Sequence, residues 1–253
     1  MIDLRGKVVL VTGGSRGIGA ATVRAVASAG ARVVLHYSAA EDRARAVADA
    51  VGGEQCCRIV QSSFQGPAAP EALWGRAVAA FGQVDVLVNN AGVFEPALLD
   101  GDAAAWRTAW QRTIQVNLMA AADLCREAVL HFRGRGGGII INVASRAAFR
   151  GGSVDYMNYA ASKGGLVSLT RTIARGYASD GVVAYVVAPG FTATELNDEF
   201  FKANSKADLV RDIPLGDIVP PEEIGSIITF LASGLARHAS GSTIDVNGAS
   251  YIR

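Results

Sequence analysis

Short apolar runs alternate along the whole chain with segments of helical composition. Apolar runs of strand length lie at 7–11, 33–37, 84–88, 139–145 and 182–189. Segments typical of helices lie at 20–29, 104–131 and 159–178. Such apolar runs favour parallel strands buried on both faces. The alternation predicts right-handed β-α-β crossovers, and therefore an α/β fold of Rossmann type, a doubly wound parallel β-sheet with helices on both faces.

No proline-, glycine- or serine-rich linker and no run of charge divides the chain, and Gly136–Gly138 is too short to serve as one. We therefore expect a single domain over residues 1–253. Its nucleotide-binding half should cover about 1–140 and its catalytic and substrate half about 141–253.

A glycine-rich stretch follows the first predicted strand and precedes the first predicted helix. Its spacing is Gly13-x-x-x-Gly17-x-Gly19, which differs from the standard dinucleotide fingerprint. Glycines let backbone N–H groups approach a pyrophosphate at a helix N-terminus. A purely conformational turn is the alternative. The predicted cofactor contacts here are Gly13, Ser15, Arg16, Gly17, Ile18 and Gly19.

The second predicted strand bears on the choice between NAD and NADP. Its end carries Tyr37 and Ser38, where an acidic residue would hold the ribose of NAD. Arg16 offers a planar guanidinium to a 2′-phosphate, unless it is merely a solvated loop cation. NADP(H) is therefore favoured, and NAD(H) remains possible.

A tyrosine and a lysine four residues apart suggest acid–base chemistry. Tyr159 and Lys163 share one helix face. The ammonium is expected to lower the pKa of the phenol toward working pH, as proton transfer to a carbonyl requires. Ser145, at the end of a buried strand pattern, can donate to a developing oxyanion. The structural alternatives are a half-buried helix tyrosine and a turn serine.

The order of these motifs resembles that of the short-chain dehydrogenase/reductase family, and of its 3-oxoacyl-acyl-carrier-protein reductases in particular. Further matching segments are Asn89–Gly92, Gln115–Leu118, Pro189–Thr194, Pro221–Ile224 and Ile244–Gly248.

The resemblance implies a role for each matching residue. Tyr159 would be the acid/base, Lys163 would lower its pKa and hold the nicotinamide ribose, Ser145 would orient the carbonyl, and Asn117 would anchor a proton relay. The implied cofactor contacts are Tyr159, Lys163, Tyr37, Ser38, Ser63, Asn89, Ala91, Gly92, Pro189, Gly190, Thr192 and Thr194. For Asn89 and Asn117, a structural hydrogen-bonding role is the alternative.

The chain departs from the family at three places. Ser63 stands where an acid usually contacts adenine, and Tyr185 stands where an asparagine is common in the strand before Pro189. The Ser145–Tyr159 interval is one residue longer than in the reductases that the chain most resembles. The resemblance to these reductases therefore does not identify the substrate of this chain. Candidate substrate contacts are Arg146, Phe94 and Phe200, with solvation the alternative for the arginine and a helix core for Phe200.

Composition excludes several other classes of protein. The net charge of +1 and the lack of a basic stripe argue against nucleic acid. The apolar runs are shorter than a membrane helix needs. Three cysteines make no disulfide framework, which predicts a cytoplasmic protein, and three scattered histidines indicate no zinc site.

The sequence thus predicts an NADP-preferring oxidoreductase that interconverts a carbonyl and a secondary alcohol on a small molecule. One alternative is an NAD-dependent dehydrogenase of a sugar, polyol or steroid-like alcohol. Another is a nucleotide-sensing protein without turnover. The resemblance also implies a homo-oligomer, most often a tetramer.

Overall fold

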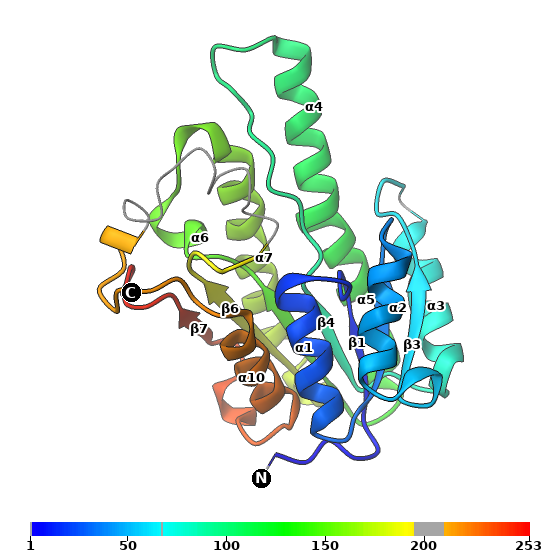
Figure 1. The fold of residues 1–253 in the computed structure, drawn as a ribbon. Coiled ribbons are helices and arrows are strands. Elements are labelled where there is room, and N and C mark those ends of the chain that lie inside the picture. Colours follow the sequence, from blue (N-terminus) through cyan, green and yellow to red (C-terminus); the bar gives the residue numbers. More distant parts are fainter. Residues whose placement is uncertain (1, 67, 195–209) are drawn as a thin grey trace.

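In a computed structural model, which describes residues 2–66, 68–194 and 210–253, parallel strands form a seven-stranded sheet (Figure 1). The strand order is β3-β2-β1-β4-β5-β6-β7. The strands are β1 (Val8–Val11), β2 (Arg32–Tyr37), β3 (Cys57–Gln61), β4 (Val86–Asn89), β5 (Gly138–Val143), β6 (Val182–Pro189) and β7 (Thr243–Val246). The predicted doubly wound α/β fold is therefore confirmed.

Helices cover both faces of the sheet. On one face lie α1 (Gly17–Ser28), α2 (Glu41–Ala50) and α10 (Pro221–Ala232). On the other lie α3 (Ala69–Phe81), α5 (Ala120–Arg133) and α7 (Met157–Gly176). Two further helices in the described part of the chain are α4 (Ala103–Ile114), which projects beyond the sheet, and the single turn α6 (Ala147–Arg150).

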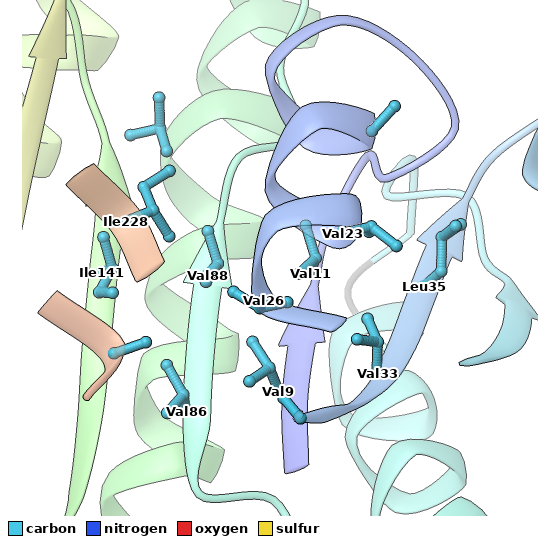
Figure 2. Close-up of a cluster of buried hydrophobic side chains, with 14 of the residues drawn as sticks. Val9, Val11, Val23, Val26, Val33, Leu35, Val86, Val88, Ile141 and Ile228 are labelled. Carbon is cyan, nitrogen blue, oxygen red and sulfur yellow. The ribbon is translucent and has the colours of Figure 1, made fainter. Parts of the chain in front are cut away.

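Successive residues of each central strand pack into the hydrophobic cores on opposite faces of the sheet, because strand side chains alternate between faces. In β1, Val9 and Val11 pack under α1 and α10, whereas Val8 and Leu10 pack toward α3 and α5. Figure 2 shows the first of these clusters, in which Val26 of α1 lies over the strands. Burial on both faces explains why the strands are continuous apolar runs.

The strand order reverses at β1, which pairs with both β2 and β4. Ligands of open α/β sheets bind beyond the carboxyl ends of the strands at such a reversal. The loops that follow β1, β4, β5 and β6 all leave this edge and carry many of the residues singled out in the sequence, and the ends of β2 and β3 add Tyr37, Ser38 and Ser63. The topology therefore assembles one site from segments that are far apart in the chain.

One predicted helix has a different form. The segment 104–131 is not one α-helix, because a π-helical turn at Gln115–Met119 joins α4 to α5. Asn117 lies in that turn and is buried. Within the described residues, no helix has the length and apolarity to cross a membrane.

Candidate active site

The loop after β1 is built on glycines that other residues could not replace. Gly13 and Gly17 have φ values of 66° and 51°, which favour glycine. A Cβ at Gly19 would lie 2.1 Å from the carbonyl oxygen of Gly13. Gly19 therefore lets α1 pack directly on the loop, and the loop keeps its backbone N–H groups near the helix N-terminus.

Two neighbouring strands hold this loop from either side. The Thr12 hydroxyl accepts hydrogen bonds from the N–H groups of Asn90 (2.9 Å) and Ala91 (3.0 Å). On the β2 side, the Gly13 N–H donates to Nδ1 of His36 at 3.2 Å. The segments that follow β1 and β4 are thereby fixed relative to each other.

A cleft of about 620 Å³ opens over the glycine loop. Of the residues predicted to bind cofactor, it is lined by Gly13, Ser15, Arg16, Gly17, Ile18, Tyr37, Ser38, Ser63, Ala91, Gly92 and Thr194. Arg43 of α2 and Asn90 also line it, although neither was predicted from the sequence. A cleft lined by glycine backbone and by arginines fits a dinucleotide phosphate.

A second cavity, of about 340 Å³, adjoins the cleft and shares Ile18, Asn90, Gly92 and Thr194 with it. Its walls include most of the remaining predicted residues: Ser145, Tyr159, Lys163, Pro189, Gly190 and Thr192. The structure thus brings the serine, tyrosine and lysine into one hollow that is continuous with the nucleotide cleft. An elongated ligand can reach from one to the other.

The pKa of Tyr159 differs from our expectation. Burial raises the pKa of this phenol to about 12, and a hydrogen bond with Ser145 opposes that rise. Lys163 Nζ lies 5.7 Å from the centre of the Tyr159 ring and donates to the carbonyl oxygen of Val143 at 2.9 Å. Desolvation therefore dominates the pKa of this phenol, and Tyr159 holds its proton.

The ammonium of Lys163 is itself buried, and burial lowers its pKa to about 8. It approaches Gly92, where an added Cβ would lie 3.6 Å from Nζ and 3.2 Å from Oδ1 of Asn117. The missing side chain at Gly92 keeps space beside Lys163 for a ligand.

The Asn117 side chain does not line either cavity. Its Oδ1 accepts from the N–H of Val93 at 2.8 Å, and its Nδ2 donates to the carbonyl oxygen of Val93 at 3.0 Å and to the Ser162 hydroxyl at 3.2 Å. Asn117 therefore ties the segment after β4 to helix α7, which carries Tyr159 and Lys163.

Ser145 follows the end of β5 and precedes α6. Its Oγ accepts a hydrogen bond from the N–H of Ala147 at 3.1 Å. The same hydroxyl forms the hydrogen bond with Tyr159 that opposes the rise in the phenol pKa.

Asn89 differs from its predicted position. Its buried side chain donates to Oδ1 of Asn142 at 2.9 Å and faces α5 through Ala121 and Cys125. Asn90 lines the cleft instead. The reason is strand alternation, because Asn89 has the same parity as Leu87, which packs toward α5. That parity was available from the sequence.

The predicted substrate residues lie as follows. Phe94 lines the catalytic cavity, stacks on Tyr156 at 4.0 Å and meets the Tyr159 ring edge-on at 4.9 Å. Arg146 also lines this cavity and is buried. Phe200 lies outside the described residues. Tyr156 and Phe191, which were not predicted to contact the substrate, line the same cavity.

Comparisons with known proteins agree with this geometry. The family model described as short chain dehydrogenase matches residues 7–205. The chain is 37% identical to 3beta-hydroxysteroid dehydrogenase 1 of Eggerthella lenta, over 97% of this chain and 94% of that protein. It is 38% identical to cis-4-hydroxycyclohexanecarboxylate dehydrogenase of Sinomonas cyclohexanicum, over 96% and 95%.

Two further proteins extend the comparison. The chain is 33% identical to the 3-oxoacyl-(acyl-carrier-protein) reductase FabG of Escherichia coli K12, over 99% of this chain and all of that one. A short-chain type dehydrogenase/reductase from Mycobacterium marinum superposes with a TM-score of 0.90 at 29% identity, covering 100% and 98% of the two chains. The chain therefore belongs to the short-chain dehydrogenase/reductase family of NAD(P)-dependent oxidoreductases.

Proposed function

We propose that the protein interconverts a carbonyl and a secondary alcohol, preferring NADP(H), with Tyr159 as general acid and base. The observation that carries the proposal is the shared cavity of Ser145, Tyr159 and Lys163, which opens into the glycine-loop cleft. The whole chain would act as one domain, with the cleft formed largely by its first half.

Each side chain has a separate task in this proposal. A dinucleotide held by the residues of the glycine-loop cleft would supply or accept the hydride. The Ser145 hydroxyl donates to the substrate oxygen and orients it. Tyr159, whose raised pKa keeps it protonated, gives its proton to that oxygen during reduction. The charge that develops on the phenol is stabilised by the Lys163 ammonium.

The proposed preference for NADP rests on two arginines of the cleft. Arg16 and Arg43 line the same cleft as Ser38, and Tyr37 ends β2 without a carboxylate for the ribose. Guanidinium groups bind phosphate in bidentate geometry. A 2′-phosphate beside them would be attracted, whereas NAD offers them no charge at that position.

The names of the relatives support the reaction class. They describe enzymes for a steroid alcohol, a cyclohexane alcohol and a 3-oxoacyl thioester. All three reactions exchange a carbonyl for a secondary alcohol, which is the chemistry proposed here.

A homotetrameric assembly is part of the proposal. Helix α4 projects from the body and carries Trp106 and Trp110, whose rings lie 5.3 Å apart (Figure 1). Nearby, Met119 is 45% exposed. A projecting helix that carries two partly buried tryptophans suits contact with another copy. We keep the cytoplasmic location as a prediction from cysteine usage.

The test is oxidation of NADPH and NADH with a panel of ketones that includes a 3-oxoacyl thioester, keto sugars and cyclic ketones. Turnover of one class, faster with NADPH, supports the proposal. Tight cofactor binding without any turnover would favour a nucleotide-sensing protein, and equal affinity for both cofactors would overturn the NADP preference. A monomeric mass measured by analytical sedimentation would contradict the proposed tetramer.

A further inference from the structure

The wall of the catalytic cavity contains a buried positive charge. Arg146 directly follows Ser145, lines the cavity and is only 8% exposed. Its guanidinium lies over the ring of Phe191 at 4.5 Å. Charged side chains are seldom buried to this extent unless an opposite charge pairs with them. The role of this buried charge can therefore be inferred from the anionic groups that pair with the guanidinium.

Its partner in the described part of the chain is shared with a second arginine. Asp212 Oδ2 lies 3.5 Å from Nη1 of Arg146 but 2.5 Å from Nη1 of Arg150. Asp212 is also half exposed, which weakens its field at Arg146. One carboxylate thus faces two guanidinium groups, and the closer pair is the one with Arg150. Most of the donors of Arg146 have capacity for another acceptor.

The aromatic walls of the cavity strengthen the attraction between this guanidinium and an anion. Phe94, Tyr156 and Phe191 are among its walls, and the whole cavity holds about 340 Å³. In such surroundings, charges interact more strongly than in water. An anionic group on a bound molecule would satisfy Arg146, while the aromatic walls would contact an apolar body of small size.

The turn that carries the arginine is held in place from behind. Phe149 of α6 stacks on Tyr251 at 6.1 Å, and the Arg253 guanidinium lies 4.8 Å from the centre of the Phe149 ring. Arg150 also donates to the carbonyl oxygen of Ser250 at 3.1 Å. Because these contacts fix α6 in the protein alone, little ordering is needed when an anion arrives.

We infer that Arg146 binds a carboxylate carried by the substrate itself, so that the protein acts on a small, largely apolar hydroxy or keto acid. The inference rests on the proposed function, since it concerns the molecule that reacts at Tyr159. Arg146 lines the same cavity as Ser145 and Tyr159, so an anion bound by Arg146 would share that cavity with the reacting carbonyl. A phosphate on a long carrier arm has the same charge but sits far from its thioester.

The test compares a cyclic keto acid, 4-oxocyclohexanecarboxylate, with its methyl ester. The readout is the ratio of kcat/KM for the acid to that for the ester, measured in the wild type, in Arg146→Met and in Arg146→Lys. We expect the wild type to prefer the acid and Arg146→Met to lower the ratio about tenfold to a hundredfold, as loss of a charged hydrogen bond does. Arg146→Lys should lower it less.

Two further variants secure the interpretation. Arg171→Met, on the exposed side of α7, removes the same charge from a helix surface outside the cavity and should leave the ratio unchanged. Asp212→Asn removes the competing carboxylate from an exposed position and should raise the ratio. Because the substituted side chain is itself half exposed, Asp212→Asn tests the inference even if Arg146→Met does not fold.

The outcomes separate this inference from the proposed function. Turnover of both ketones with a ratio that ignores Arg146 and Asp212 overturns the inference and leaves the proposed function standing. If neither ketone reacts, calorimetric binding of cyclohexanecarboxylate to the NADP⁺-loaded protein decides. Binding that Arg146→Met weakens at least about tenfold supports the inference without turnover, and binding that it does not weaken overturns it.

A third arm identifies the source of the anion. The 3-oxoacyl group is presented on coenzyme A, which carries phosphates, and on N-acetylcysteamine, which carries none. A loss in Arg146→Met confined to the coenzyme A thioester would assign the charge to a carrier phosphate and overturn the carboxylate assignment. An equal effect on both thioesters, with the acid-to-ester ratio lowered, supports it.

Discussion

The Nδ1 atom of His36 accepts a hydrogen bond from the backbone N–H of Gly13 at 3.2 Å. The ring proton must therefore sit on Nε2, which lies 3.0 Å from the carbonyl oxygen of Ser62. His36 thus connects the glycine loop to the end of β3 only while it is neutral. Burial lowers its pKa to about 4.

This arrangement predicts a loss of stability in mild acid. The unfolded chain takes up a proton at His36 near pH 6.5, whereas the folded chain does so near pH 4. The contribution is therefore fully present above pH 6.5 and is lost as the pH falls toward 4, by about 3 kcal/mol in all. Urea unfolding of the wild type and of His36→Gln across this range measures it, as the difference between the two free energies of unfolding.

The control for that experiment is His238→Gln, which changes an exposed histidine. Its difference from the wild type should stay constant through the same range. A wild-type-minus-His36→Gln difference that is equally flat would show that the folded protein protonates His36 as readily as the unfolded chain does.

Removal of the Tyr159 hydroxyl should abolish catalysis while sparing the cofactor. Tyr159→Phe deletes the proton donor but keeps the ring that Phe94 meets edge-on. We expect kcat to fall by about 10²- to 10⁴-fold, the usual contribution of a positioned acid or base. The Kd of NADPH, measured by fluorescence, should change by less than threefold, roughly within 0.7 kcal/mol.

Tyr156→Phe supplies the matched control, because Tyr156 lines the same cavity and stacks on Phe94, the residue that also meets the Tyr159 ring. Its effect on kcat should be much smaller. Comparable losses in both variants would mean that neither phenol is the proton donor.

Arg16→Ala should reduce discrimination between the two cofactors. Loss of a guanidinium beside a 2′-phosphate is expected to raise the Kd of NADPH about tenfold to a hundredfold and to leave that of NADH nearly unchanged. Arg43→Ala should act in the same direction, since Arg43 lines the same cleft. Titration calorimetry with both nucleotides makes the comparison.

Arg45→Ala is the control from α2, the helix that carries Arg43. Arg45 pairs with Glu41 on the surface at 2.7 Å and does not line the cleft. It should move neither Kd. If Arg16→Ala leaves the NADPH-to-NADH ratio unchanged, the 2′-phosphate is held elsewhere.

Gly19→Ala should destabilise the protein through a backbone clash. The new Cβ would lie 2.1 Å from the carbonyl oxygen of Gly13, so the loop or α1 must move, at a cost of about 1–3 kcal/mol. Gly75→Ala, in α3, meets nothing within 4 Å and should stabilise by about 0.5–1 kcal/mol. Opposite shifts in Tm are expected, and a stable Gly19→Ala would contradict the packing described.

The sequence predicted most of this fold because its strands are buried on both faces. Runs such as 182–189 are apolar throughout, and β6 occupies that range. The residues after the strands then had to meet at one edge of the sheet. The proximity of Ser145 and Tyr159 could therefore be predicted from the order of strands and helices along the chain.

Other features depend on three-dimensional surroundings that residue spacing does not contain. The spacing of Tyr159 and Lys163 indicates their proximity but not the desolvation that raises the phenol pKa. Likewise, Arg146 has the sequence surroundings of a loop arginine, and its burial depends on Phe191, more than forty residues later in the chain.

Because of the π-helical turn at Gln115–Met119, the number of residues in this helix sets the rotation of α4 relative to α5. A π-turn holds one residue more than an α-turn, and each residue advances an α-helix by about 100°. Deleting one residue there would restore a continuous helix and rotate one half against the other. Either Asn117 would leave Val93, or the buried stripe of α5 would leave the sheet. An insertion or deletion in this stretch would therefore rotate α4 relative to α5, and the contacts of one or the other helix would be lost.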